Sequence, residues 1–101
     1  MSTKITFVIN NPSDPAAFES LYEQVLTSAR ELPGLRRLES AKVWPKEDGT
    51  PTPAYRTLDL YFDDYDSASA ATATPAAGEL FGQLISSGTA FTGLFSDIEK
   101  I

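Results

Sequence analysis

The chain offers few groups that could move a proton at neutral pH, because its 101 residues include no histidine and no cysteine. One carboxylate has a promising position: Asp59 alternates with Tyr55 and Tyr61 on one face of an expected strand. If that face is buried, the carboxylate of Asp59 would be kept from water and could act as a general base. The competing interpretation is a wet strand edge or an ion pair with one of three arginines, Arg36, Arg37 or Arg56.

Aromatic side chains with one polar atom on an apolar body could line a small-molecule cleft between helices and sheet. Four residues of this kind are candidates for substrate binding: Tyr22, Trp44, Tyr55 and Tyr61. Packing in the core is the ordinary role of an aromatic residue on a helix, so both roles stay open.

A cluster of carboxylates, Asp63, Asp64 and Asp66, could suggest a hard cation. No glycine or glutamate follows at the spacing of a calcium loop, so stabilisation of a helix start explains the cluster better. The chain has no G-x-S-x-G turn, no G-x-G-x-x-G fingerprint and no P-loop. We therefore expect no metal, no cofactor, no serine-hydrolase chemistry and no nucleotide site.

The overall charge argues against anionic partners. Eight basic and fourteen acidic residues give a net charge of −6 and a pI near 4.4, so nucleic acid and anionic bilayers would repel the chain. No apolar run approaches the roughly 18 residues of a membrane span, and no signal-peptide pattern opens the sequence. We expect a cytoplasmic protein with one domain over residues 1–101.

The residues 13–35 are typical of an amphipathic helix that needs a sheet to cover. Asp14 is suited to cap its first turn, Pro15 to its first position, and Pro33-Gly34 to its end. The apolar stripe consists of Phe18, Leu21, Tyr22, Val25, Leu26 and Ala29. The residues expected to face away are Glu19, Glu23, Gln24, Ser28 and Glu31.

Four segments are expected to be strands: 4–10, 35–44, 55–62 and 89–98. The second has its apolar residues Leu38 and Val43 on opposite parities, which predicts a bulge or a frayed start, and Gly93 predicts a weak point or bulge in the fourth. Residues 45–53 carry three prolines and are expected to form a mobile hairpin loop.

The segment 63–88 predicts a second helical region. Alanine-rich residues 67–73 favour a short helix, and Thr74-Pro75 is suited to begin a second one that ends at Gly88. Its expected apolar stripe consists of Leu80, Phe81, Leu84 and Ile85.

The order strand, helix, strand, strand, helix, strand predicts an α+β, ferredoxin-like βαββαβ fold. Its antiparallel four-stranded sheet would carry helices on one face only. The second face would present Tyr55 and Tyr61 beside Thr6 and Val8, a patch too apolar to remain in water. We therefore expect a homodimer in which two sheets pack face to face.

The chain resembles the EthD-like branch of the dimeric α+β barrel superfamily over nearly its whole length. The resemblance rests on the segments Asn11-Pro12-Ser13-Asp14-Pro15, Leu32-Pro33-Gly34-Leu35 and FDDYDSASAATATPAAGELFGQL, with Phe18 and Tyr22 between the first two. It implies the same face-to-face dimer. Members of that superfamily include cofactor-free monooxygenases, lactone isomerases, polyketide cyclases and haem enzymes.

The chain departs from the family at one position. EthD-like proteins commonly carry a histidine late in the first helix, where this chain has Val25 or Leu26. Proton transfer through histidine and a histidine-ligated haem are therefore excluded. The resemblance implies a protein that holds a small, largely apolar organic molecule in a helix–sheet cleft. The alternative is a cofactor-free isomerase, cyclase or monooxygenase in which Asp59 and the tyrosines supply the acid–base groups.

Overall fold

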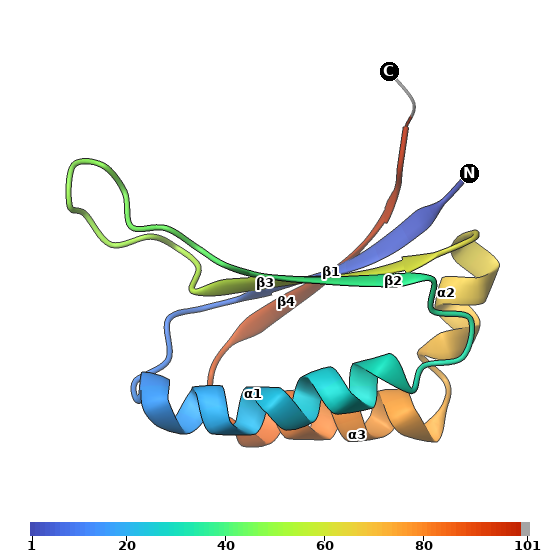
Figure 1. The fold of residues 1–101 in the computed structure, drawn as a ribbon, viewed down its shortest axis with the longest axis horizontal. Helices are drawn as coiled ribbons and strands as arrows, with labels where there is room; N and C mark the ends of the chain where they lie inside the picture. Colours follow the sequence, from blue (N-terminus) through green and yellow to red (C-terminus); the bar gives the residue numbers. More distant parts are fainter. Residues whose placement is uncertain (100–101) are drawn as a thin grey trace.

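A computed structural model describes residues 1–99 and shows one sheet with three helices on one side of it (Figure 1). The elements in chain order are β1 (Thr3–Ile9), α1 (Pro15–Arg30), β2 (Arg37–Lys42), β3 (Arg56–Phe62), α2 (Tyr65–Ala71), α3 (Pro75–Ser86) and β4 (Phe91–Asp97). No helix within this part of the chain is both long and apolar enough to span a membrane.

The sheet has the strand order β2-β3-β1-β4, and every neighbouring pair is antiparallel. This arrangement confirms the predicted ferredoxin-like fold. Because β1 and β3 are the central strands, their inward side chains form the middle of the core. Ile5, Phe7 and Ile9 of β1 are buried there with Leu58 and Leu60 of β3.

Helix α1 begins where the sequence predicted. The carboxylate of Asp14 accepts a hydrogen bond from the backbone N–H of Ala17 at 3.2 Å, and Pro15 follows at the first helical position. The turn after the helix contains Gly34 at a φ of +80°, which only glycine adopts without strain. Ser28 was expected to face solvent, but it is buried, because α3 packs against that side of α1.

The second helical region consists of two short helices. Helix α2 begins at Tyr65, two residues earlier than expected, because the side chain of Asp64 caps it by accepting from the N–H of Ser67 at 2.8 Å. Thr74 and Pro75 begin α3 as predicted. Ile85 was expected in the apolar stripe of α3, but it is exposed because that side of the helix points away from both α1 and the sheet.

The two edge strands are more regular than expected. The β2–β3 pairing runs without interruption from Arg37 opposite Tyr61 to Lys42 opposite Arg56, so β2 contains no bulge and simply begins two residues late. The β1–β4 pairing is also continuous, with Gly93 opposite Phe7. A β-carbon at Gly93 would lie 3.4 Å from the Phe7 ring, so this glycine makes room for an aromatic side chain instead of marking a bulge.

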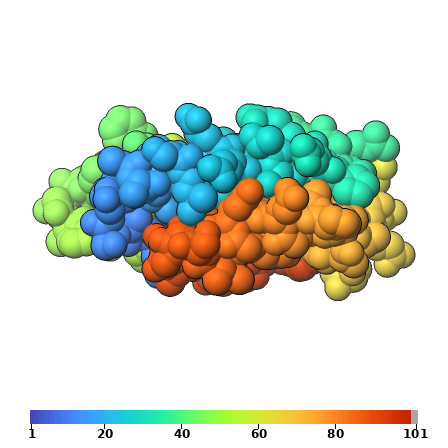
Figure 2. Space-filling view, turned by 90° about the horizontal axis from the view of Figure 1, so that it is seen from below, coloured from blue at the N-terminus to red at the C-terminus, as the bar shows by residue number. Residues whose placement is uncertain are grey.

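The two faces of the sheet are covered differently. Helices α1 and α3 lie side by side over one face, as the view onto them shows (Figure 2), and bury the core beneath them. No helix of residues 1–99 covers the other face, which we call the open face (Figure 1). The cross-strand pairing places the following side chains on it: Lys4, Thr6, Val8, Arg37, Glu39, Ala41, Thr57, Asp59, Tyr61, Thr92, Leu94 and Ser96.

Residues 43–55 form the predicted hairpin loop, which extends from the end of the sheet opposite the termini (Figure 1). The side chain of Asn11 donates to the carbonyl of Thr52 at 2.8 Å and ties the loop to the end of β1. Asp48 closes the loop's own turn by accepting from the N–H of Thr50 at 3.0 Å.

Candidate functional site

A small apolar cavity lies between the helices and the sheet. Its walls come from β1, β3, α3 and the ends of α1 and α2: Ile5, Phe7, Leu32, Leu60, Thr72, Ala77, Leu80 and Phe81. Its volume is about 10 Å³, which is about the space of one water molecule. The side chains thus close the helix–sheet cleft almost completely in this structure.

The cavity wall offers no free polar group to a ligand. Thr72 is the single lining residue with a side-chain oxygen, and its hydroxyl donates to the carbonyl of Ser69 at 2.6 Å. Phe81 is half-buried, as is Thr72, and its ring packs edge to face with the Phe7 ring, with centroids 5.8 Å apart. This arrangement suits a hydrocarbon group and gives no acid or base to act on it.

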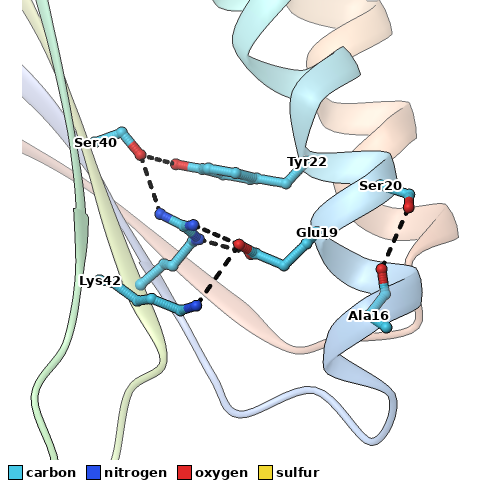
Figure 3. A network of polar contacts seen from close by, with 7 residues as sticks. Ala16, Glu19, Ser20, Tyr22, Ser40 and Lys42 are labelled. Carbon is cyan, nitrogen blue, oxygen red and sulfur yellow. Dashed lines mark hydrogen bonds and ion pairs between the residues drawn. The ribbon is translucent and has the colours of Figure 1, made fainter.

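Besides the apolar cavity, a set of hydrogen-bonded polar residues joins α1 to β2 and β3 (Figure 3). The guanidinium of Arg56 donates from Nε and Nη2 to the two carboxylate oxygens of Glu19, at 2.8 and 2.6 Å. Lys42 Nζ lies 3.9 Å from the same carboxylate, and the Tyr22 and Ser40 hydroxyls share a hydrogen bond of 2.8 Å. We call Glu19, Tyr22, Ser40, Lys42 and Arg56 the Arg56 network.

Glu19 and Tyr22 of the Arg56 network have pKa values shifted in opposite directions, for different reasons. The hydrogen bonds from Arg56 lower the pKa of Glu19 below its ordinary value of 4.5. Burial raises the pKa of Tyr22, because an ionised phenol would lose its hydration there. The Arg56 guanidinium also stacks over the Tyr22 ring at 4.7 Å from its centroid. Because Nε and Nη2 of Arg56 both donate hydrogen bonds to Glu19, this arginine links helix α1 to the sheet.

The Arg56 network was missed at the level of sequence, although one signal pointed to it. Arg56 has the same parity as the buried Leu58 and Leu60, so its side chain had to face the helices. A charge on the core-facing side of a strand needs a partner. Glu19 supplies it, yet the expected orientation of Glu19 away from the sheet concealed the pair.

Asp59 lies on the open face, partly shielded by its neighbours. Its carboxylate accepts a hydrogen bond from the Thr6 hydroxyl and lies 3.7 Å from Lys4 Nζ, with 19% of the side chain exposed. Its partner is thus a lysine on β1 and none of the three arginines considered from the sequence. The proposed role of Asp59 as a base stays a prediction.

Tyr61 lies beside Asp59 on the same face. Its hydroxyl donates to Glu39 at 2.5 Å, and the Arg37 guanidinium lies over its ring at 4.2 Å from the centroid. The hydrogen bond to Glu39 raises the pKa of Tyr61. The open face therefore carries the Tyr61 phenol and two carboxylates, and the cations Lys4 and Arg37 lie beside them.

Tyr55 was expected on the open face, and that expectation is wrong. Its N–H donates to the carbonyl of Ile9, one residue out of the register that pairs Ile9 with Arg56, so the alternation of β3 does not extend to it. The Tyr55 ring instead meets the ring of Phe18 on α1, edge to face, with centroids 5.8 Å apart. Trp44 lies in the hairpin loop with 87% of its surface exposed, and its expected role in substrate binding stays a prediction.

The structure therefore does not bring the five predicted site residues together. Tyr22 and Tyr55 lie on the helix side near Arg56, Asp59 and Tyr61 lie on the open face, and Trp44 lies in the loop. A molecule bound in the apolar cavity would be separated from Asp59 by the sheet itself.

Two of the three clustered aspartates, Asp63 and Asp64, have structural partners. Asp64 caps α2, and Asp63 accepts two hydrogen bonds from Arg36, at 3.0 and 2.7 Å. Within residues 1–99, no three side chains of the metal-binding types gather closely enough to share an ion.

Comparison with solved structures defines the class of fold. An EthD family protein of Bacillus halodurans superposes with a TM-score of 0.90 and 22% identity, covering 98% of this chain and all of the other. A dimeric ferredoxin-like protein of unknown function from Jannaschia gives 0.74 and 18%, covering 97% of this chain and 100% of that one. SnoaB, a cofactor-independent oxygenase from Streptomyces nogalater, gives 0.72 and 14%, with 99% and 95% covered. The ferredoxin-like fold that the resemblance to EthD-like proteins implied is thereby confirmed.

The family follows from a relative that is similar in sequence. No family model matches the chain. Over 103 aligned residues, however, it is 33% identical to an uncharacterised 11.0 kDa protein in the thcB-thcC intergenic region of Rhodococcus erythropolis, covering 97% of this chain and 96% of the relative. The chain therefore belongs to the same family as this Rhodococcus protein.

Proposed function

We propose that this protein holds a small, largely apolar organic molecule between its helices and its sheet, without histidine-based catalysis. The observation that carries the proposal is the apolar cavity, whose walls are hydrocarbon apart from one already bonded hydroxyl. Such walls bind by removing apolar surface from water and discriminate against groups that need hydrogen bonds.

Entry of a ligand requires one wall of the cavity to move, and Phe81 is that wall. It is half-buried on α3, whereas its neighbours Leu80 and Leu84 are fully buried. A Phe81 ring that swings outward exchanges its contact with Phe7 for solvent and leaves space for an aromatic or aliphatic group in its place.

The test is a binding experiment with a panel of lactones and polycyclic phenols, followed by backbone amide shifts in NMR. We expect shifts around the cavity in the wild type, stronger binding in Phe81→Ala and loss of binding in Ala77→Leu, whose added carbons fill the cavity. Gly82→Ala is the matched control, because this position of α3 is exposed with no neighbour within 4 Å. Binding that ignores both cavity variants, or no binding by any compound, would contradict the proposal.

The alternative is a cofactor-free isomerase, cyclase or monooxygenase, and the fold shared with SnoaB favours it. In this version Asp59 acts as the base, assisted by Tyr61, and the substrate lies on the open face beside them. Turnover of a panel compound that is abolished by Asp59→Asn would support the enzyme. Binding at the cavity without turnover would support the binder.

We also propose that two copies pair through their open faces. The proposal is supported by the absence of any covering helix on that face within residues 1–99 and by the relative from Jannaschia, which is described as dimeric. Sedimentation equilibrium at micromolar concentration should give about twice the chain mass of 11.0 kDa. A single species of the chain mass would refute the pairing.

A further inference from the structure

The Arg56 network leaves hydrogen-bond donors available at the β2 edge of the sheet. Nη1 of Arg56 reaches the exposed Ser40 hydroxyl only at 3.4 Å, the long end of hydrogen bonding, whereas Nε and Nη2 are bonded to Glu19. Lys42 Nζ lies 3.9 Å from the Glu19 carboxylate, beyond hydrogen-bond distance, and the lysine side chain is 60% exposed. A guanidinium N–H and an ammonium group can therefore still donate to an acceptor that comes from solvent.

The Arg56 network also carries a surplus of positive charge, although the whole chain carries −6. Lys42 and Arg56 supply two positive charges, and Glu19 supplies a single negative one. Glu23, the next acid along α1, lies on another side of the helix, because it lines the groove between α1 and α3. Glu39 of β2 has the opposite parity to Lys42 and faces the other side of the sheet. An anion that reaches the network therefore meets one unbalanced cation.

Hydrocarbon side chains follow these donors along the same two elements. Helix α1 and strand β2 run in opposite directions (Figure 1), and the hydrogen bond between Tyr22 and Ser40 joins them. Leu26 is one helical turn beyond Tyr22, a rise of about 6 Å. Leu38 is two residues before Ser40 on the same side of β2, a step of about 7 Å in the same direction. These two half-buried leucines therefore lie opposite each other and extend the strip between α1 and β2 past its polar end.

We propose that the strip between α1 and β2 binds a small organic acid, with the carboxylate at its polar end and the hydrocarbon part beside the two leucines. The carboxylate accepts hydrogen bonds from Lys42 Nζ, Arg56 Nη1 and the Ser40 hydroxyl. Tyr22 then donates to Ser40 across their 2.8 Å contact, which leaves the proton of Ser40 for the ligand. Donors that carry a charge favour a carboxylate over a neutral amide of the same shape. The apolar cavity is lined by other residues, so this inference does not rest on the function proposed for it.

The test is an NMR titration with phenylacetate, compared with its neutral amide, phenylacetamide, at low ionic strength. We expect phenylacetate to shift the backbone amides of residues 19–26 and 38–42, and phenylacetamide to bind about 10-fold more weakly or less. Lys42→Gln keeps the length of the side chain and removes its charge. This variant should raise the dissociation constant for phenylacetate by about 10-fold, because a hydrogen bond between two charged groups is lost.

Lys46→Gln is the matched control, because it removes the same charge from an exposed position of the hairpin loop and should leave the dissociation constant unchanged. Ala77→Leu, which fills the apolar cavity, should also leave it unchanged, so the two sites can fail separately. Circular dichroism confirms that each variant folds. The proposal is overturned if phenylacetate does not bind, if it binds no better than phenylacetamide, or if Lys42→Gln binds it like the wild type. Binding that is lost in Ala77→Leu would assign phenylacetate to the cavity and overturn the proposal as well.

Discussion

The two faces of this sheet are made by the same four strands, yet one is apolar and covered by helices and the other is polar and uncovered. The face beneath α1 and α3 is filled by aliphatic and aromatic side chains that leave a cavity of about 10 Å³. The open face carries four charged residues, a tyrosine and several threonines in the same strands. The first face is closed by the chain's own helices, whereas the second keeps polar groups that can stay in water until something covers it.

The comparison shows that a surface proposed to bind a partner need not be mainly hydrophobic. The open face was expected to be too apolar for water, and this is wrong in part, because Tyr55 turns to the helix side and charged side chains flank Tyr61. A face that is neutral in sum and patterned in sign can stay hydrated in a single copy and still be selective for a partner.

The largest difference in the free energy of unfolding between the two faces should appear for two neighbouring residues of β3. Leu60→Ala removes a fully buried side chain and should lower the free energy of unfolding by about 2 to 5 kcal/mol. Tyr61→Phe, one residue further along and on the open face, should cost well under about 1 kcal/mol, because it removes a single exposed hydrogen bond to Glu39. Urea unfolding of both variants measures the difference; equal losses would mean that the open face is already part of a core.

The helix-covered face also contains the polar Arg56 network, whose contribution to stability can be measured. A double-mutant cycle of Glu19→Gln and Arg56→Leu should give a coupling free energy of about 1 to 2 kcal/mol, modest because Glu19 is one-third exposed. The pKa of Glu19 is lowered in the folded state, so the coupling is present above 4.5 and decreases as pH falls through the lowered value. Coupling that rose toward acid pH would contradict the assignment.

The smallest effect concerns the turn that carries the chain from α1 to the sheet. Gly34→Val should destabilise by about 1 kcal/mol, because a β-branched residue is strained at a φ of +80°. Gly82→Ala in the middle of α3 should instead stabilise by about 0.5 to 1 kcal/mol, since nothing crowds the added methyl. A melting temperature of Gly34→Val that is unchanged or raised would show that the backbone at Gly34 is not constrained.

Local signals predicted most of the fold correctly. Asp14 and Thr74 cap α1 and α3, and the alternation of Leu58, Leu60 and Phe62 identified a strand with one buried face. Each of these features depends on residues within a few positions of one another, so the sequence contains the whole cause.

The features that sequence could not supply depend on packing between distant segments. Ser28 is buried because α3 lies beside α1, where its hydroxyl donates to the Gln83 side chain at 3.1 Å. The pairing of Glu19 with Arg56 depends on how far α1 stands along the sheet. Tyr55 changes face through a single shift in register. For the candidate site, the sequence therefore identified residues able to do chemistry, but it did not predict which of them lie close together in space.

The start of β1 and the end of β4 lie together, since the N–H of Ile98 donates to the carbonyl of Ser2 at 2.8 Å, and both turn away from the helices (Figure 1). An affinity tag or fluorescent protein joined at either end would consequently emerge at the rim of the uncovered surface. Such a fusion would hinder self-association sterically, so untagged material is the proper sample for mass measurements.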